Sequence, residues 1–490
     1  MVSDGFGPAS ETIARTFIAE LKGNSSYVSP LDEILVGSSR TKSSDSLITD
    51  SASGATAWTC GSKTYNAAIA VLDDKTRTPC GTVMEAAHKK GLKTGLVTTA
   101  RITHATPAAW NSHVVDRDFE ALIAQQQIGN ATLGRVTDLM FGGGACFYQP
   151  KSVKGSCRTD ERDLFDEAAK KYGWHVKNDR KGFDSIKATD ASELPVISLL
   201  TPSHMSYDID RDAAKEPSLK EMAEKAVTLL YEATKNSDKG FLIMIEGARI
   251  DMAAHNLDSA GHIRDVLAYW EAAAWVKDFV RKHGDDTVMI SVSDHETGGA
   301  TLGRQVTKEY PPYVFYPTKM QNVTNSTESL SKAILKLNYT TDADGPRQKY
   351  LRDTVLPKNL GLTNFTEADV QRIALANDST LLMDELGNQT SWRMQMGWTT
   401  HGHSGVDVNL YSYGRHSHLL RGSHENTDLN KFIAEYLDLD LAPITAAIKN
   451  EVTKQAAATP RALFKQKKLS AELTQLFISD LKTHDHGHEN

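Results

Sequence analysis

The sequence has no long hydrophobic run. None of its 490 residues belongs to a stretch near the roughly 18 consecutive apolar residues that a membrane-spanning helix requires. Hydrophobic residues make up 40% and charged residues 24%, as in ordinary globular proteins. We therefore expect a water-soluble chain, long enough for one large catalytic domain with insertions or for two or three ordinary domains.

The sequence also lacks a basic excess. It has 55 Lys and Arg against 62 Asp and Glu, a formal net charge of −7. Nucleic-acid binding is disfavoured, because it needs a basic face. The acidic excess fits either a solvated surface or a set of metal ligands, and composition alone does not separate the two.

Cysteine is scarce, and its spacing excludes some sites. Neither of the neighbouring pairs has the C-x-x-C spacing of a zinc or redox motif; the pairs are Cys60 with Cys80 and Cys146 with Cys157. On the cysteines alone, two local disulfides and four buried thiols are both open.

Glycosylation sequons favour the disulfides. Six of eight N-x-[ST] triplets fall between 322 and 390; the eight begin at Asn24, Asn130, Asn322, Asn325, Asn338, Asn364, Asn377 and Asn388. This clustering indicates a glycosylated surface that faces a secretory lumen, where cysteines are oxidised.

Four apolar, β-branched runs predict buried parallel strands that end at small or acidic residues. They lie in 95–110, 195–204, 241–255 and 287–299. Helical patterns at 218–235 and 262–283 separate them. We expect an α/β fold with helices on both faces of the sheet.

The character of the chain changes between residues 300 and 393. Prolines, six sequons and charged helical pieces indicate an insertion there. The chain would then form a catalytic domain of residues 1–299 and 394–440, and a C-terminal helical segment at 441–490. His484, His486 and His488 near its end favour a solvated tail over a metal site.

Reactive side chains stand at the expected strand ends, where ligands gather in open α/β sheets. Glu246 follows one strand, and Asp251 and His255 come next at helical spacing, so both can reach one cation. Alone, this Asp-His pair is more often a surface ion pair. Asp294 and His295 follow another wholly apolar strand, where coordination of a metal would offset the cost of burial; a helix cap beside a satisfied histidine is the alternative.

A serine and an arginine complete the candidate site. Ser51 follows Asp50 and opens a small-residue helix, whose N-terminal amides favour a phosphate; simple helix capping is the common alternative. Arg117, eleven residues beyond Thr106, could clamp two phosphate oxygens.

Six ordered motifs resemble the alkaline phosphatase family, most closely its fungal vacuolar, repressible type. They are VSDGFGP, TDSASGATAW, HATPAAWNSHVVDR, EGARIDMAAH, SDHETGG and THGHSGVDV. The resemblance implies a three-layer sandwich with a crown-like insertion at 300–393. It also implies a homodimer in the lumen of the secretory pathway; in relatives this compartment is the vacuole, and a membrane anchor holds the enzyme there. The implied substrates are small-molecule phosphomonoesters, and peptide or protein phosphomonoesters as well.

The resemblance implies a role for each motif residue. Asp251, His255 and His403 would bind one zinc, with His401 as the fallback for His403; Asp4, Asp294 and His295 would bind a second zinc. Asp4, Thr106 and Glu246 would bind one magnesium, and Arg117 would hold the phosphate in line with Ser51. The mechanism implied is displacement of the alcohol by Ser51, followed by hydrolysis of a phosphoserine.

The chain departs from the family pattern in three places. Met252 stands where relatives carry histidine or lysine, and a thioether cannot donate a hydrogen bond, so we expect weaker phosphate binding. His104 replaces the aspartate of some bacterial members, which favours looser magnesium binding. Only Met1, Val2 and Ser3 precede Asp4, where the family has a full apolar strand, so we expect a start-truncated chain with a shortened central strand.

Two other functions remain to be weighed. A sulfatase or phosphodiesterase would share the metal architecture, but the sulfatase C-x-P-x-R motif is absent and phosphodiesterases usually offer threonine where Ser51 stands. A non-catalytic glycoprotein that keeps the fold should have lost a ligand or the nucleophile, yet all positions are filled.

Overall fold

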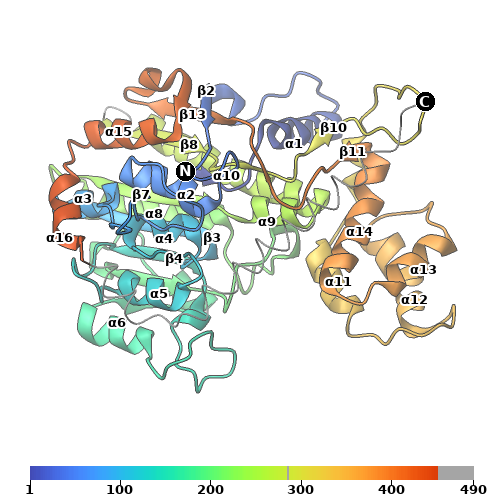
Figure 1. Cartoon of the computed structure of the whole chain (residues 1–490), viewed down its shortest axis with the longest axis horizontal. Coiled ribbons are helices and arrows are strands. Elements are labelled where there is room, and N and C mark those ends of the chain that lie inside the picture. The colour runs from blue at the N-terminus through green and yellow to red at the C-terminus, as the bar shows by residue number, and fades with distance from the viewer. Residues whose placement is uncertain (284–285, 451–490) are drawn as a thin grey trace.

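A ten-stranded sheet forms the centre of the molecule (Figure 1). The computed structural model describes residues 1–283 and 286–450. All neighbouring strands are parallel except β13, which is antiparallel to both of its neighbours. In sheet order the strands are β14 (Gly422–Glu425), β2 (Leu35–Arg40), β13 (Val408–Gly414), β8 (Val288–Val292), β1 (Val2–Ser3), β7 (Phe241–Gly247), β3 (Lys93–Arg101), β4 (Leu139–Gly143), β6 (Val196–Leu199) and β5 (His175–Val176).

Helices cover both faces of this sheet, and two hydrophobic cores lie between the layers. Successive residues of a strand point to opposite faces, so Leu96 and Met244 enter one core while Val97 and Ile245 enter the other. The helices against the first core are α2 (Ser51–Cys60), α3 (Val83–Lys89), α4 (Ala105–Asn111), α5 (Glu120–Ile128), α6 (Leu164–Tyr172) and α15 (Asn426–Tyr436). Those against the second are α1 (Pro8–Leu21), α7 (Arg180–Ser185), α8 (Leu219–Thr234) and α10 (Ser259–Lys282). The predicted three-layer α/β architecture is confirmed.

Short elements complete the part of the chain that contains the central sheet. Helix α9 (Arg249–His255) follows β7, and α16 (Ala442–Ile448) packs near α3. Single 3-10 turns occur at Asp32–Ile34, Ala145–Phe147, Ala191–Glu193, Asp208–Asp210 and Ser417–Leu420. The three tail histidines at 484, 486 and 488 lie outside the described residues.

Four helices, drawn in orange in Figure 1, lie together at one side of the sheet. They are α11 (Thr327–Ile334), α12 (Pro346–Tyr350), α13 (Glu367–Leu375) and α14 (Ser379–Met394), with a 3-10 turn at Pro317–Met320 and a π-helix at Leu351–Asn359. At their base β10 (Thr301–Leu302) pairs antiparallel with β11 (Met396–Gly397), which joins the two ends of the segment. A third core packs these helices against Ile13 and Phe17 of α1 and Ile263 of α10.

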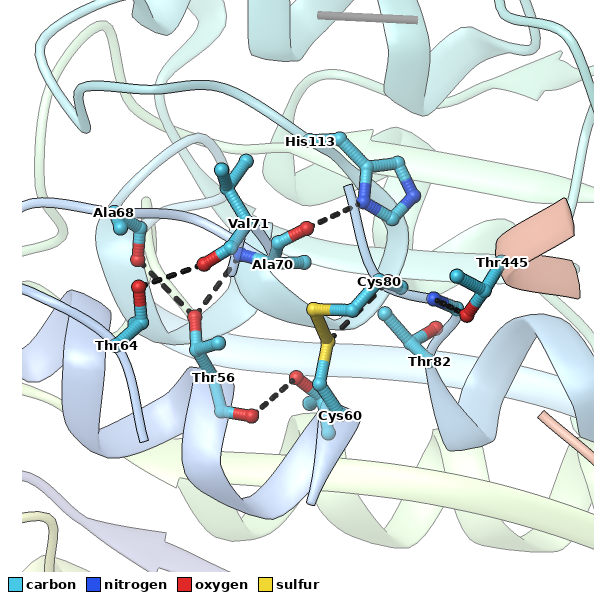
Figure 2. Close-up of a disulfide and its surroundings, with 12 residues drawn as sticks. Thr56, Cys60, Thr64, Ala68, Ala70, Val71, Cys80, Thr82, His113 and Thr445 are labelled. Carbon is cyan, nitrogen blue, oxygen red and sulfur yellow. Dashed lines mark hydrogen bonds between the residues drawn. A yellow bond between two sulfur atoms is a disulfide. The ribbon is translucent and has the colours of Figure 1, made fainter. Parts of the chain in front are cut away.

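Both predicted disulfides are present: Cys60–Cys80 and Cys146–Cys157. Figure 2 shows the first at the C-terminal end of α2. Nearby, Thr56 Oγ1 donates to the Ala68 carbonyl at 3.1 Å and accepts from the Ala70 amide at 2.9 Å. The covalent bond and these hydrogen bonds fasten α2 to the 64–80 loop, so the helix that begins at Ser51 is held along its length.

No helix among residues 1–283 and 286–450 is both long and apolar enough to span a membrane.

Candidate active site and metal centres

The candidate site lies at the carboxyl ends of β1, β7, β3 and β8, where strand-end residues meet at one edge of the sheet. Asp4 follows β1, Glu246 is near the end of β7, and Asp294 and His295 follow β8. All four are buried, with exposures of 0–1%. The structure therefore brings together strand ends that are almost 300 residues apart in the sequence.

The nucleophile candidate Ser51 is the first residue of α2. Asp50 caps this helix by accepting from the Ser53 amide at 3.0 Å. Because Ser51 is the first helical residue, it lies at the positive end of the helix dipole. The helix packs tightly because Gly54 has no side chain: a Cβ there would come within 2.9 Å of Asp294 Cβ. Ser51 Oγ lies 3.2 Å from His295 Nε2.

Around His295, three side chains converge on one point. His295 Nε2 is 3.2 Å from Asp294 Oδ2 and 3.7 Å from Asp4 Oδ1. The donor atoms of these three residues lie within 4.8 Å of one another, which is the spacing that one cation needs. Thr297 Oγ1 lies 3.2 Å from His295 Nδ1, so the opposite ring nitrogen faces the carboxylates.

A second group of donors surrounds Asp251. His255 Nε2 is 3.3 Å from Asp251 Oδ2, and His403 Nε2 is 3.2 Å from His255 Nε2 and 3.7 Å from Asp251 Oδ1. Asp251 and His403 also fall within 4.8 Å of a His295 donor atom, so the two groups adjoin. His403 arrives here because β12 (His403–Ser404) pairs with β9 (Glu296–Thr297), directly after the β8 ligands.

Backbone hydrogen bonds set the orientation of these imidazoles. His403 Nδ1 donates to the Thr49 carbonyl at 2.7 Å, and His255 Nδ1 donates to the His401 carbonyl. With Nδ1 engaged in this way, the Nε2 atom of each ring faces Asp251. His401 is instead half-exposed, and its Nε2 lies 3.4 Å from Asp384. The geometry favours His403 over His401 as a ligand.

Several buried oxygens at the site have no hydrogen-bond partner within the described part of the chain. They are both carboxylate oxygens of Asp4, Asp294 Oδ2, Glu246 Oε1 and Thr106 Oγ1. Buried polar atoms are almost always hydrogen-bonded, because burial removes their hydrogen bonds to water and an unpaired atom has no protein hydrogen bond to offset that cost. A shared set of unpaired acceptors in a single cluster fits a cation-binding site.

The carboxylates also perturb one another. Burial, followed by the nearby Asp294, Asp251 and Glu246, raises the pKa of Asp4 well above its ordinary value. Burial raises the pKa of Glu246 to about 8, although Thr98 Oγ1 donates to it at 2.5 Å. A bound cation reverses such shifts, since its charge outweighs the neighbouring carboxylates.

Arg117 stands near the N-terminus of α2, held by two partners. Its Nη1 donates to Asp50 Oδ2 at 3.1 Å, and its Nη2 lies 2.9 Å from His104 Nε2. Burial, Arg117 and His204 together lower the pKa of His104 well below its usual range, which keeps it neutral. His104 thus contacts the guanidinium here.

Sequence reasoning missed several supporting residues. Thr98 holds Glu246, and Thr297 Oγ1 donates to Asp251 Oδ1 at 2.5 Å. The sequence predicts Asp50 only as a helix cap, yet it also anchors Arg117. Thr297 and Asp50 stand inside the quoted motifs, next to predicted site residues, which is the signal that could have identified them.

Met252 contacts a buried arginine. Arg249 Nη1 lies 2.9 Å from Met252 Sδ, and Arg249 Nη2 donates to Glu328 Oε2 of α11 at 2.8 Å. The guanidinium also stacks over the Tyr207 ring, 3.6 Å from its centroid. The helix that carries Asp251 is thereby tied to helix α11.

The fold is a mostly parallel α/β sheet, and its site places a carboxylate–histidine cluster beside a serine at a helix N-terminus. This combination is typical of α/β proteins that carry out metal-assisted hydrolysis. Comparisons then identify the family. A family model described as alkaline phosphatase matches residues 1–439. The chain is 43% identical to alkaline phosphatase of Schizosaccharomyces pombe over 452 residues, with 92% of this chain and 82% of that protein covered.

It is also 43% identical to repressible alkaline phosphatase of Saccharomyces cerevisiae over 470 residues, with the same coverage. Among solved structures, alkaline phosphatase from Thermus thermophilus superposes with a TM-score of 0.74 at 26% identity, covering 90% of each chain. A cold-active alkaline phosphatase from Shewanella sp. gives 0.74 at 27% identity, covering 89% of this chain and 98% of that one. The chain belongs to the alkaline phosphatase family, and the resemblance predicted from its motifs is confirmed.

Proposed function

We propose that this chain hydrolyses phosphate monoesters to an alcohol and inorganic phosphate, with Ser51 as the nucleophile of a phosphoserine intermediate. The observation that carries the proposal is the position of Ser51 Oγ. It lies at the N-terminus of α2 and 3.2 Å from His295, at the edge of the unpaired carboxylate cluster. Family membership supports the same reaction.

The donor set supports two zinc ions and one magnesium ion. Asp251, His255 and His403 would hold the first zinc, and Asp4, Asp294 and His295 the second, since zinc prefers mixed imidazole and carboxylate ligands. Asp4, Thr106 and Glu246 offer only oxygens, which suits magnesium. When bound, such cations stabilise the attacking and leaving oxygens as Lewis acids.

The chain's own residues position the substrate and accept its phosphoryl group. Arg117, fixed by Asp50, presents its planar guanidinium to two phosphate oxygens, and the N-terminal amides of α2 stabilise negative charge beside Ser51. Ser51 Oγ forms a bond to phosphorus while the bond to the alcohol oxygen breaks and the alcohol leaves with a proton. Water then attacks phosphorus from the opposite side, the Oγ–P bond breaks, and Ser51 regains its hydroxyl proton.

We further propose that the enzyme is a glycosylated homodimer of the secretory lumen, with the vacuole as its compartment. Two disulfides support an oxidising environment. Seven of the eight sequon asparagines are exposed, and Asn325 is half-buried. The fungal relatives named above support the compartment, and small-molecule, peptide and protein phosphomonoesters are the proposed substrates.

The deciding experiment combines metal content with turnover. We expect purified protein to contain zinc and magnesium and to hydrolyse p-nitrophenyl phosphate, and Ser51→Ala to keep its metals but lose turnover. Bis-p-nitrophenyl phosphate and p-nitrophenyl sulfate serve as controls for a diesterase or sulfatase, and both should be poor substrates. Full metal loading of the wild-type chain without turnover would contradict the proposal and favour a non-catalytic glycoprotein.

A further inference from the structure

His255 and His401 hold each other through two reciprocal hydrogen bonds. His255 Nδ1 donates to the His401 carbonyl, and His401 Nδ1 donates to the His255 carbonyl at 2.7 Å. His255 is the last residue of α9, and the final carbonyls of a helix have no partner inside that helix. The His401 ring therefore caps the C-terminal end of α9, while the His401 backbone orients the His255 ring.

Asp384 reaches the other side of the His401 ring from α14. Its Oδ1 lies 3.4 Å from His401 Nε2, and this oxygen is buried without a hydrogen-bond partner among residues 1–283 and 286–450. Because His401 Nδ1 already gives its hydrogen to a carbonyl, attraction at Nε2 needs one more proton between the ring and the carboxyl group. Either group can carry that proton, and the contact is attractive in both cases.

The packing of α14 places Asp384 at this position. Gly387 stands three residues after Asp384 and so lies on the same face of the helix. A Cβ at Gly387 would come within 2.7 Å of the carbonyl oxygen of Leu257, two residues beyond His255. The missing side chain thus lets α14 approach the chain that leaves α9, and the same face carries Asp384 to His401.

Among the histidines of the candidate site, His255 depends most on hydrogen bonds for its orientation. Its side chain is 36% exposed, against 13% for His403 and 0% for His295. Packing therefore restrains the His255 ring less than the other two. The His401 side chain is itself 51% exposed, so water could satisfy both of its nitrogens, yet both contact protein groups.

We propose that His401 and Asp384 are positioning residues for the first zinc. Asp384 holds the His401 ring, and His401 holds His255 with its Nε2 3.3 Å from Asp251 Oδ2 and 3.2 Å from His403 Nε2. Helix α14 thereby supports a metal ligand on α9 without contributing a ligand of its own. The inference rests on the proposed zinc centre and gives His401 a role other than that of a ligand.

The test measures zinc affinity by competition with a chromophoric chelator, on the full chain with magnesium in excess. His401→Ala, Asp384→Ala and the double variant are compared with wild type, and His255→Ala identifies the zinc-binding step that belongs to this site. Asp384→Asn is the conservative variant, because its amide can donate to a neutral His401 Nε2. The matched control is Glu385→Gln, which removes the neighbouring carboxylate of α14 from its pair with Arg372.

We expect His401→Ala to weaken that zinc-binding step by about 10- to 100-fold, as is typical when a group that orients a metal ligand is removed. Asp384→Ala should weaken it by about tenfold, and Asp384→Asn by less. The double variant should lose no more than His401→Ala, because Asp384 acts through His401. The other zinc-binding step, and both steps in Glu385→Gln, should stay unchanged.

Three results would overturn the inference: an unchanged affinity in His401→Ala, equal weakening of both zinc-binding steps, or additive losses in the double variant. A wild-type chain that binds fewer than two zinc ions would contradict the proposed metal centre and this inference with it. Turnover of p-nitrophenyl phosphate is recorded separately, because its absence would contradict the proposed reaction without altering the zinc affinities.

Discussion

Glu11 is a buried carboxylate whose ionisation should make stability fall as pH rises. It lies on α1, is 2% exposed, and accepts from the Ser29 hydroxyl and from Trp270 Nε1. Burial outweighs these hydrogen bonds and raises the pKa of Glu11 from 4.5 to about 7. The folded state therefore retains a proton that the unfolded state has lost between these two values.

The magnitude follows from linkage. Stability falls with pH wherever the folded state binds more protons, at about 1.4 kcal/mol per pH unit for one proton. As the pH rises from 4.5 to about 7, ionisation of Glu11 lowers the free energy of unfolding by about 3 kcal/mol. This loss is complete above the pKa that Glu11 has in the folded state. Glu11→Gln keeps the shape of the side chain and cannot ionise, so the variant lacks this loss.

The assay is urea unfolding of wild type and Glu11→Gln between pH 5 and pH 8. We expect the free energy of unfolding of the variant, relative to wild type, to rise by about 2 to 3 kcal/mol over this range. Glu20→Gln, at an exposed position of the same helix, is the matched control. A difference between Glu11→Gln and wild type that stays constant with pH would refute the reasoning.

Three further changes test other parts of the structure. Arg117→Lys replaces a planar guanidinium held by Asp50 with a point charge; kcat/KM should fall about 100-fold, while Arg162→Lys, in the remote pair with Glu167, should leave it unchanged. Met252→His restores a hydrogen-bond donor next to Asp251, so inorganic phosphate should inhibit more strongly, and an unchanged inhibition constant would contradict the role assigned to Met252. The double variant Cys60→Ser with Cys80→Ser opens a loop with a sequence separation of 20, and it should lower the free energy of unfolding in urea by about 3 kcal/mol. Cys146→Ser with Cys157→Ser, whose separation is 11, should lower it slightly less. A double variant as stable as wild type would contradict this.

The strand ends could be predicted from the sequence because the local pattern determines them. Apolar runs that stop at Glu246 or Asp294 indicate both a buried strand and the edge where its last residues meet other strand ends. The helical spacing of Asp251 and His255 likewise places both on one face. The motifs that resemble the family include these strand ends and this helical pair, so they too can be recognised from the local sequence.

Long-range pairing could not be predicted in the same way. His403 reaches the site only because β12 pairs with β9, and nothing in the local pattern around His403 specifies that partner. The contact of His104 with Arg117 and the tie between Arg249 and Glu328 of α11 also depend on tertiary packing. The insertion boundaries at 300 and 393 and the assignment of each metal to its ligands remain predictions.

The most direct test of the central claim is to trap the phosphorylated enzyme. Wild-type protein is mixed with a ³²P-labelled phosphate monoester at mildly acidic pH and quenched in acid, and the labelled peptide is sequenced. The account predicts label on Ser51 and none in a Ser51→Ala protein that retains its zinc and magnesium. Label on another residue, or turnover by metal-loaded Ser51→Ala at the wild-type rate, would contradict it.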